Sequence, residues 1–125
     1  MPWSFQADTP IYTQLVARLQ EQIVSGAYPP GSKLPSVRDL AADAGVNPNT
    51  VQRAFAELER LGLIYTQRTA GKFVTENAAA IDAARRALAE GQTRQYLAAM
   101  SALGFDRAAL ITFLNQMEET KDANS

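Results

Sequence analysis

The sequence has neither cysteine nor histidine among its 125 residues. Without cysteine there is no disulfide, no thiolate nucleophile and no cysteine-ligated metal site. Without histidine the chain lacks the usual zinc ligand, the Ser-His-Asp arrangement and the side chain that ordinarily titrates near neutral pH. Carboxylate or lysine catalysis stays open in principle, but these absences argue against an enzyme, and we expect no metal and no cofactor.

Long apolar runs and a charge excess of either sign are also missing. No stretch approaches the ~20 apolar residues that span a bilayer, and the N-terminus lacks the basic start and apolar core of a secretory signal. We therefore expect a soluble, cytoplasmic protein with no membrane contact. Because 12 Lys and Arg stand against 13 Asp and Glu, any binding to nucleic acid depends on where the cations lie.

Apolar residues recur every four positions in the first predicted helix, which is a pattern typical of an amphipathic helix with one buried face. Thr9 is the expected N-cap, and Gly26 suits the left-handed conformation that ends many helices. The apolar positions are Ile11, Leu15, Leu19 and Ile23.

Two further helix starts follow in close succession. The hydroxyl of Ser36 can cap the amide of Asp39, which predicts a short helix that ends at Gly45. Asn47 followed by Pro48 is a strong signal for the start of the next helix. Two helices joined by so tight a turn form a helix-turn-helix pattern.

A β-hairpin is predicted directly after the third helix. Residues 63–66 and 72–75 are β-prone, and the polar connection between them contains Gly71. In this position the hairpin predicts the wing of a winged helix. The expected fold class is therefore mainly α with a small β wing.

Residues 78–125 are rich in alanine and read as two helices that begin at the caps Asn77 and Asp106, with a possible break at Gly91. Their apolar stripes need a partner. Packing back onto the N-terminal part is one alternative, and a homodimer interface is favoured. We thus predict a DNA-binding domain at 1–77 and a dimerisation domain at 78–125. The predicted dimerisation residues are Ile81, Leu88, Tyr96, Leu97, Met100, Leu103, Leu110, Ile111, Leu114 and Met117.

The third helix carries the strongest functional signal. Its first half presents polar side chains that can bond phosphates or base edges, and a recognition helix enters the major groove with its N-terminal residues leading. Its second half is more acidic. The alternative is an ordinary solvated face, with Arg53 paired to Glu57 one turn on. The polar residues are Asn49, Thr50, Gln52 and Arg53.

Arg38 has no ion-pair partner three or four positions away on its own helix, so it is free to reach a phosphate or a guanine edge. Lys33 and Ser36 extend the same polar edge. At the wing, Arg68 and Lys72 flank Gly71, where the backbone can approach another chain closely. Ordinary surface charge is the alternative for all of them. We expect the cations of the helices and the wing to share one face.

Residues 8–76 resemble a GntR-type winged-helix repressor through the motifs at residues 10–15, 23–41, 46–54, 58–64 and 71–74. The short C-terminal part is similar to that of the YtrA-type subfamily. The resemblance implies a bacterial transcription factor that binds double-stranded DNA at a pseudo-palindromic operator as a homodimer. The DNA-facing set that it implies is Ser36, Arg38, Asn47, Asn49, Thr50, Gln52, Arg53, Gly71 and Lys72.

A second class of function stays open from the sequence. The neutral net charge suits a winged helix that serves as a protein-interaction module without specific DNA binding. A small-molecule effector is compatible with either class, but no polar cluster identifies one. The steep salt dependence of DNA binding distinguishes the two classes.

Overall fold

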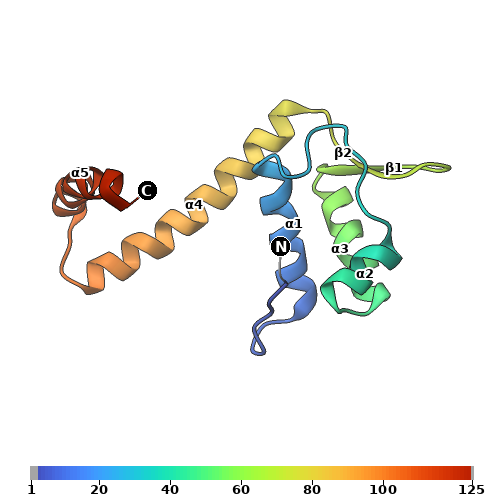
Figure 1. Ribbon diagram of the computed structural model, residues 1–125, viewed down its shortest axis with the longest axis horizontal. Helices are drawn as coiled ribbons and strands as arrows, with labels where there is room; N and C mark the ends of the chain where they lie inside the picture. Colours follow the sequence, from blue (N-terminus) through green and yellow to red (C-terminus); the bar gives the residue numbers. More distant parts are fainter. Residues whose placement is uncertain (1–2, 125) are drawn as a thin grey trace. The chain divides into compact units, whose positions relative to one another are not determined.

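The computed structural model describes residues 3–124, with side chains described from Trp3 to Met117 (Figure 1). The chain divides into two compact units, residues 1–86 and 87–125. The mainly helical fold with a small antiparallel wing confirms the expected fold class. Its elements are α1 (Ile11–Val24), α2 (Val37–Ala44), α3 (Pro48–Arg60), β1 (Ile64–Gln67), β2 (Gly71–Val74), α4 (Ala78–Ala102) and α5 (Arg107–Asn124).

The caps predicted for the helix-turn-helix are confirmed. Ser36 Oγ accepts a hydrogen bond from the backbone N–H of Asp39 at 3.0 Å. Gly45 ends α2 in the left-handed conformation, with φ of 71°. Asn47 Oδ1 accepts from the N–H of Asn49 at 2.8 Å, at the start of α3. These local bonds satisfy the amides that a helix start leaves unpaired, so the turn between α2 and α3 is set by short-range chemistry.

The core of the first unit lies between α1 and α3. Their buried residues come from every third or fourth position, as an amphipathic helix requires. Strand and loop residues close the core around Phe55, which is 1% exposed. The fully buried large side chains are Leu15, Leu19, Ile23, Val51, Phe55, Leu58, Leu63 and Val74.

The start of α4 belongs to this first unit. Asn77 Oδ1 accepts from the amides of Ala79 and Ala80, so the helix begins where the sequence predicts. Ile81, predicted as a dimerisation residue, lies in the core of the first unit at 6% exposure. Arg85 donates through Nε and Nη2 to the carbonyl of Val24 at the end of α1. The functional boundary after Asn77 stays a prediction, while these contacts extend the first compact unit into α4.

The base of the wing is fixed by a segment of the loop between α1 and α2. Residues 31–34 lie along β2 through three backbone hydrogen bonds. Gly31 N–H donates to the carbonyl of Val74, Val74 N–H donates to Ser32, and Leu34 N–H donates to Lys72, at 2.8 to 2.9 Å. The chain that leads into α2 therefore also supports the hairpin.

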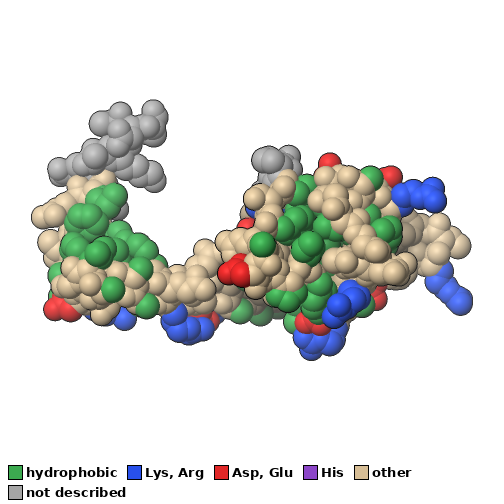
Figure 2. Space-filling model, turned by 90° about the horizontal axis from the view of Figure 1, so that it is seen from below, with side chains coloured by type: hydrophobic (Ala, Val, Ile, Leu, Met, Phe, Trp, Pro, Cys, Tyr) green, Lys and Arg blue, Asp and Glu red, His purple; other side chains and the backbone are tan. Residues whose placement is uncertain are grey.

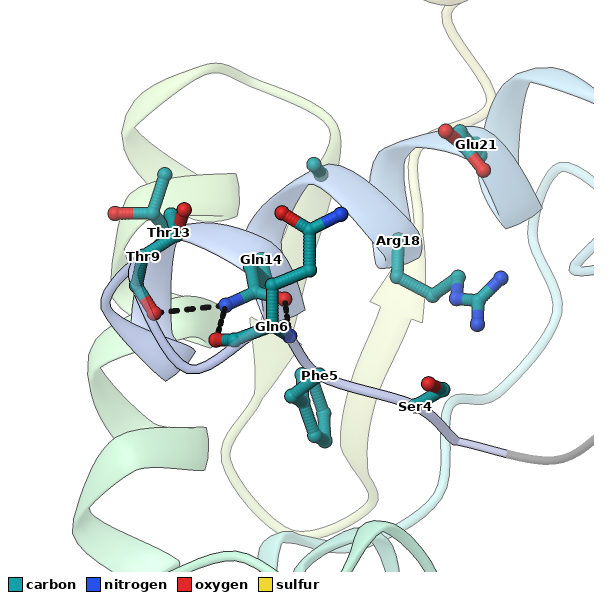
Figure 3. Close-up of a pocket in the computed structure, with 9 residues that line it drawn as sticks. Ser4, Phe5, Gln6, Thr9, Thr13, Gln14, Arg18 and Glu21 are labelled. Atoms are coloured by element: carbon teal, nitrogen blue, oxygen red, sulfur yellow. Dashed lines mark hydrogen bonds between the residues drawn. The ribbon is translucent and has the colours of Figure 1, made fainter.

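The start of α1 differs from the prediction. Thr9 is not the N-cap, because Pro10 occupies that position with an extended ψ of 136° and no side-chain cap bond forms. Gln14 binds the preceding chain instead. Its Nε2 donates to the carbonyls of Gln6 and Thr9, and its Oε1 accepts from the N–H of Gln6 at 2.7 Å. Figure 3 shows these bonds beside a hollow of about 380 Å³.

The residues before α1 are held against the helical domain. The indole Nε1 of Trp3 donates to Asp43 Oδ2 on α2 at 2.9 Å. The ring of Trp3 stacks on Phe5, with centroids 5.9 Å apart, and the guanidinium carbon of Arg18 lies over the Trp3 ring, 5.7 Å from its centroid. These contacts connect the lead-in to α1 and α2.

The second unit contains the remainder of α4 and α5. α4 runs through Gly91 without the break that the sequence allowed. Asp106 Oδ1 accepts from the N–H of Ala109 at 2.8 Å and caps α5 as predicted. The rings of Phe105 and Phe113 pack 5.2 Å apart. Hydrophobic side chains nevertheless remain on the surface over α5 (Figure 2).

Among the described residues, no single helix is both long and apolar enough to cross a membrane. By length and composition alone, the segments Ala78–Ala102 and Arg107–Met117 would be long and apolar enough only when they are taken together, and the pair is bent by 101°.

Candidate nucleic-acid interface

The first half of α3 presents a continuous polar surface. Asn49, Gln52 and Arg53 are exposed and Thr50 is half-buried, while Val51 on the opposite side is fully buried. This division follows from the helical repeat, because the buried residues of α3 occupy one face. Hydrogen-bond donors and acceptors are thus displayed at the end of α3 that a recognition helix directs into the major groove.

Asn47, which the resemblance places among the DNA-facing residues, also caps α3. Its side-chain carbonyl is occupied by the cap bond to Asn49 N–H, which leaves its amide hydrogens exposed to solvent. The cap orients the first turn of α3 and, with it, the neighbouring polar side chains.

Arg53 lies on an aromatic ring. Its guanidinium carbon is 4.2 Å from the ring centroid of Tyr12 on α1. A cation over an aromatic face at an exposed site is stabilised by about 0.5–1 kcal/mol. The ring engages the π-facing side of the cation without using a hydrogen-bond donor, so the N–H groups of Arg53 can still donate hydrogen bonds. Arg53 is therefore oriented by a residue of α1 and not by a residue of its own helix.

The carboxylate expected as the alternative partner of Arg53 is bound elsewhere. Glu57 accepts from Arg60 Nε at 2.9 Å, and a second contact joins its other oxygen to Arg60 Nη2. These hydrogen bonds from Arg60 lower the pKa of Glu57. Arg60, one turn further along α3, therefore binds the carboxylate of Glu57. Arg53 instead contacts the ring of Tyr12.

The other acid in the second half of α3 is also paired. Glu59 Oε1 accepts from Lys72 Nζ and from Thr66 Oγ1, each at 2.5 Å. The hydrogen bond from Lys72 is the main cause of the lowered pKa of Glu59. Each of the two acids that would repel a phosphate backbone is accompanied by a cation. The acidic half of α3 is thus locally close to neutral.

Arg38 and Arg68 are available to a partner. Both are exposed, and neither side chain has a hydrogen bond or an ion pair among the residues that the structure describes. Arg38 projects from the first turn of α2, and Arg68 follows directly after β1 at the wing tip. Figure 2 shows cationic side chains at the hairpin end of the first unit.

Lys33 and Gly71 come together at the wing. Gly71 has φ of +110°, and a Cβ built there would lie 3.2 Å from Lys33 Cε. A side chain at position 71 would be strained and would push against Lys33. Ser36 stands next to this segment with its oxygen engaged in the cap of α2. Lys72, in contrast to Lys33, extends its ammonium group to Glu59 on α3.

Sequence reasoning missed two residues of this surface. Tyr12 and Glu59 act through contacts with residues 41 and 13 positions away in the chain. Tyr12 carried no local signal, because an aromatic residue on an amphipathic helix is ordinarily assigned to the core. Glu59 was expected only to repel a phosphate backbone, as one of the acids in the second half of α3.

The sequence matches the family described as bacterial regulatory proteins, gntR family, over residues 11–74. It is 35% identical over 115 residues to the uncharacterized HTH-type transcriptional regulator YhcF of Bacillus subtilis (strain 168), covering 92% of this chain and 95% of that protein. It is 48% identical over 73 residues to the HTH-type transcriptional repressor YtrA of the same organism, covering 58% of this chain and 56% of the repressor.

Solved structures extend these matches to the fold. A GntR family transcriptional regulator from Listeria monocytogenes has a TM-score of 0.82 and 40% identity, covering 90% of this chain and 98% of that one. The AraR(DBD) complex with operator ORX1 has a TM-score of 0.55 and 27% identity, covering 60% and 99%. The matched family and relatives are named as transcriptional regulators, which are not enzymes. The chain therefore belongs to the GntR family of bacterial regulatory proteins.

Proposed function

We propose that this DNA-binding regulator is a sequence-specific repressor that binds a pseudo-palindromic operator as a homodimer. The observation that carries the proposal is the exposed polar start of α3, where Arg53 is oriented by Tyr12 at 4.2 Å. Two relatives support it. YtrA is named a transcriptional repressor, and the DNA-binding domain of AraR was solved with an operator.

In the proposed complex the N-terminal half of α3 enters the major groove. Asn49, Gln52 and Arg53 meet base edges, since amide and guanidinium groups form paired hydrogen bonds with adenine and guanine. Arg38 reaches a guanine edge or a neighbouring phosphate from α2. Arg68 contacts the flanking backbone from the wing tip. The remaining polar residues of this surface contact the phosphate backbone of the DNA and fix the position of the protein on it. They are Thr50, Lys33, Ser36 and Gly71.

We assign dimerisation to the second unit. Large apolar side chains on α4, on α5 and at Leu103 directly after α4 remain 36–72% exposed, and a monomeric surface rarely carries so many together. A second copy of the same face would cover them with two-fold symmetry. Leu88 and Met100 are partly exposed on α4, whereas Leu110 is buried within its own unit and Ile81 within the other. The exposed set is Tyr96, Leu97, Leu103, Ile111, Leu114 and Met117.

Selection from a random duplex pool at about 150 mM salt tests this proposal. We expect an enriched inverted repeat, with half-sites about one helical turn or a multiple of it apart. Affinity for that duplex should fall by orders of magnitude between about 50 and 200 mM salt if roughly 6–10 phosphates are contacted.

Matched arginine variants locate the contact on the protein. Arg38→Ala and Arg53→Ala should each weaken binding to the enriched duplex, by about 1–3 kcal/mol where a guanine contact is lost. Arg94→Ala, an exposed arginine on α4, is the control and should bind like the wild type. A protein-interaction module is the better explanation if no sequence is enriched, or if both variants bind as tightly as the control.

A further inference from the structure

We propose that Glu59 positions the wing by holding Lys72, and that Lys72 serves operator binding through Glu59 instead of through a phosphate. This inference rests on the proposed DNA-binding function. It gives a role to an acid of the recognition helix, and it changes the role expected for the wing lysine.

Glu59, Thr66 and Lys72 form a closed network, which we call the wing clamp. Lys72 Nζ donates to Glu59 Oε1 at 2.5 Å and to Thr66 Oγ1 at 2.7 Å, and Thr66 Oγ1 donates to the same Glu59 oxygen at 2.5 Å. Thr66 and Lys72 are direct cross-strand partners. The clamp therefore joins both strands of the hairpin to one carboxylate of α3.

The place of the clamp in the hairpin explains what it can do. Residues 31–34 already fix the base of the wing along β2. Beyond the pair of Thr66 with Lys72, only the pair of Gln67 with Gly71 remains before the tip. A two-stranded ribbon twists readily and is of marginal stability alone. The clamp is thus placed to set the direction in which Arg68 projects relative to α3.

The surroundings of Lys72 argue against a phosphate contact. Two of the three hydrogens of its ammonium group are used within the protein, and its side chain is 27% exposed. The adjacent carboxylate compensates its charge, and a phosphate would have to compete with that carboxylate. Arg68 has neither restraint, since the described residues give it no partner.

Charge predicts opposite outcomes for the two possible roles of Glu59. If Glu59 is only an acid near DNA, its neutralisation removes repulsion and strengthens binding. If Glu59 holds the wing, the same substitution replaces the charge-assisted hydrogen bonds from Lys72 and Thr66 with weaker bonds to a neutral amide oxygen, so binding weakens although the protein becomes more positive. Glu57 is the matched control, because its carboxylate is bound by Arg60 on its own helix and does not contact the wing.

The experiment measures the affinity of the full-length chain for the enriched inverted-repeat duplex by fluorescence anisotropy at several salt concentrations. Glu59→Gln should weaken binding by about fivefold, whereas Glu57→Gln should bind as tightly as the wild type or more tightly. Lys72→Met should weaken binding without changing the slope of log affinity against log salt concentration. Arg68→Met should reduce that slope by about one, as the loss of one phosphate contact predicts. The inference is overturned if Glu59→Gln binds as tightly as the wild type, or if Lys72→Met reduces the slope as Arg68→Met does.

Charge reversal and amide exchange complete the test. Glu59→Lys with Lys72→Glu should recover part of the affinity that either single reversal loses, because the ion pair is restored. In the free protein, Glu59→Gln should speed hydrogen exchange at the amides of residues 66–72, and Glu57→Gln should not. If the wild type binds no duplex, the proposed function fails, while unchanged exchange in Glu59→Gln overturns the clamp itself.

Discussion

Replacement of Tyr12 by leucine should weaken operator binding without removing any group from the polar face of α3. The guanidinium carbon of Arg53 lies 4.2 Å from the ring centroid of Tyr12. At this exposed site the contact contributes about 0.5–1 kcal/mol, which corresponds to about a two- to fivefold change in affinity. Without the ring, Arg53 must lose more rotamer freedom when it binds DNA, so the loss is expected mainly as faster dissociation.

Tyr12→Phe separates the ring from its hydroxyl. It keeps the aromatic face, so its affinity should stay within about twofold of the wild type. Affinities are measured by fluorescence anisotropy, with thermal melting to show that each variant is folded under the assay conditions. In an Arg53→Ala background, Tyr12→Leu should have no further effect, because the contact no longer exists.

Two results would refute this reasoning. An equal loss in Tyr12→Phe and Tyr12→Leu would assign the effect to the hydroxyl group and not to the ring. A full additional loss in the Arg53→Ala background would show that Tyr12 acts independently of Arg53.

Three further predictions concern stability and assembly. Asn47→Ala removes the cap of α3 and should cost about 1 kcal/mol, a fall of roughly 4–8 °C in the thermal midpoint for a domain of this size. Ile111→Asp with Leu114→Asp should convert a dimer to the 13.6 kDa monomer in sedimentation equilibrium. Glu59 has a lowered pKa, so its pairing stabilises the fold above the ordinary value of 4.5 and is lost as the pH falls through the lowered pKa. Acid titrations of unfolding should therefore show a weaker dependence on pH in Glu59→Gln than in the wild type.

The elements with local signals could be predicted from the sequence. Asn47 and Ser36 mark helix starts because a short polar side chain reaches an amide two or three residues ahead. Gly45 marks the end of α2 because the left-handed conformation disfavours other residues. These signals were enough for the helix-turn-helix, the wing and the winged-helix fold.

The contacts that orient the candidate site join distant residues, so the local patterns did not contain them. Arg53 had Glu57 as its nearest acid in the helical repeat, but Arg60 competes for that carboxylate and Tyr12 of another helix lies against the arginine. The polar exposed face was predictable, because it needs only the helical period. Lys72 was predicted as a DNA-facing cation beside Arg68, since nothing in the hairpin sequence indicates that an acid on α3 is its partner.

Trp3 also makes the lead-in observable in solution. It is the single tryptophan of the chain, and its indole is bonded to α2 through Asp43. The emission of the unlabelled protein therefore reports whether the N-terminal segment is docked on the helix that carries Arg38. Because the chain has no cysteine, one introduced thiol at the wing tip would accept a dye at that position alone. The emission of Trp3 and the signal of the dye could then follow both edges of the proposed DNA-binding surface during one titration.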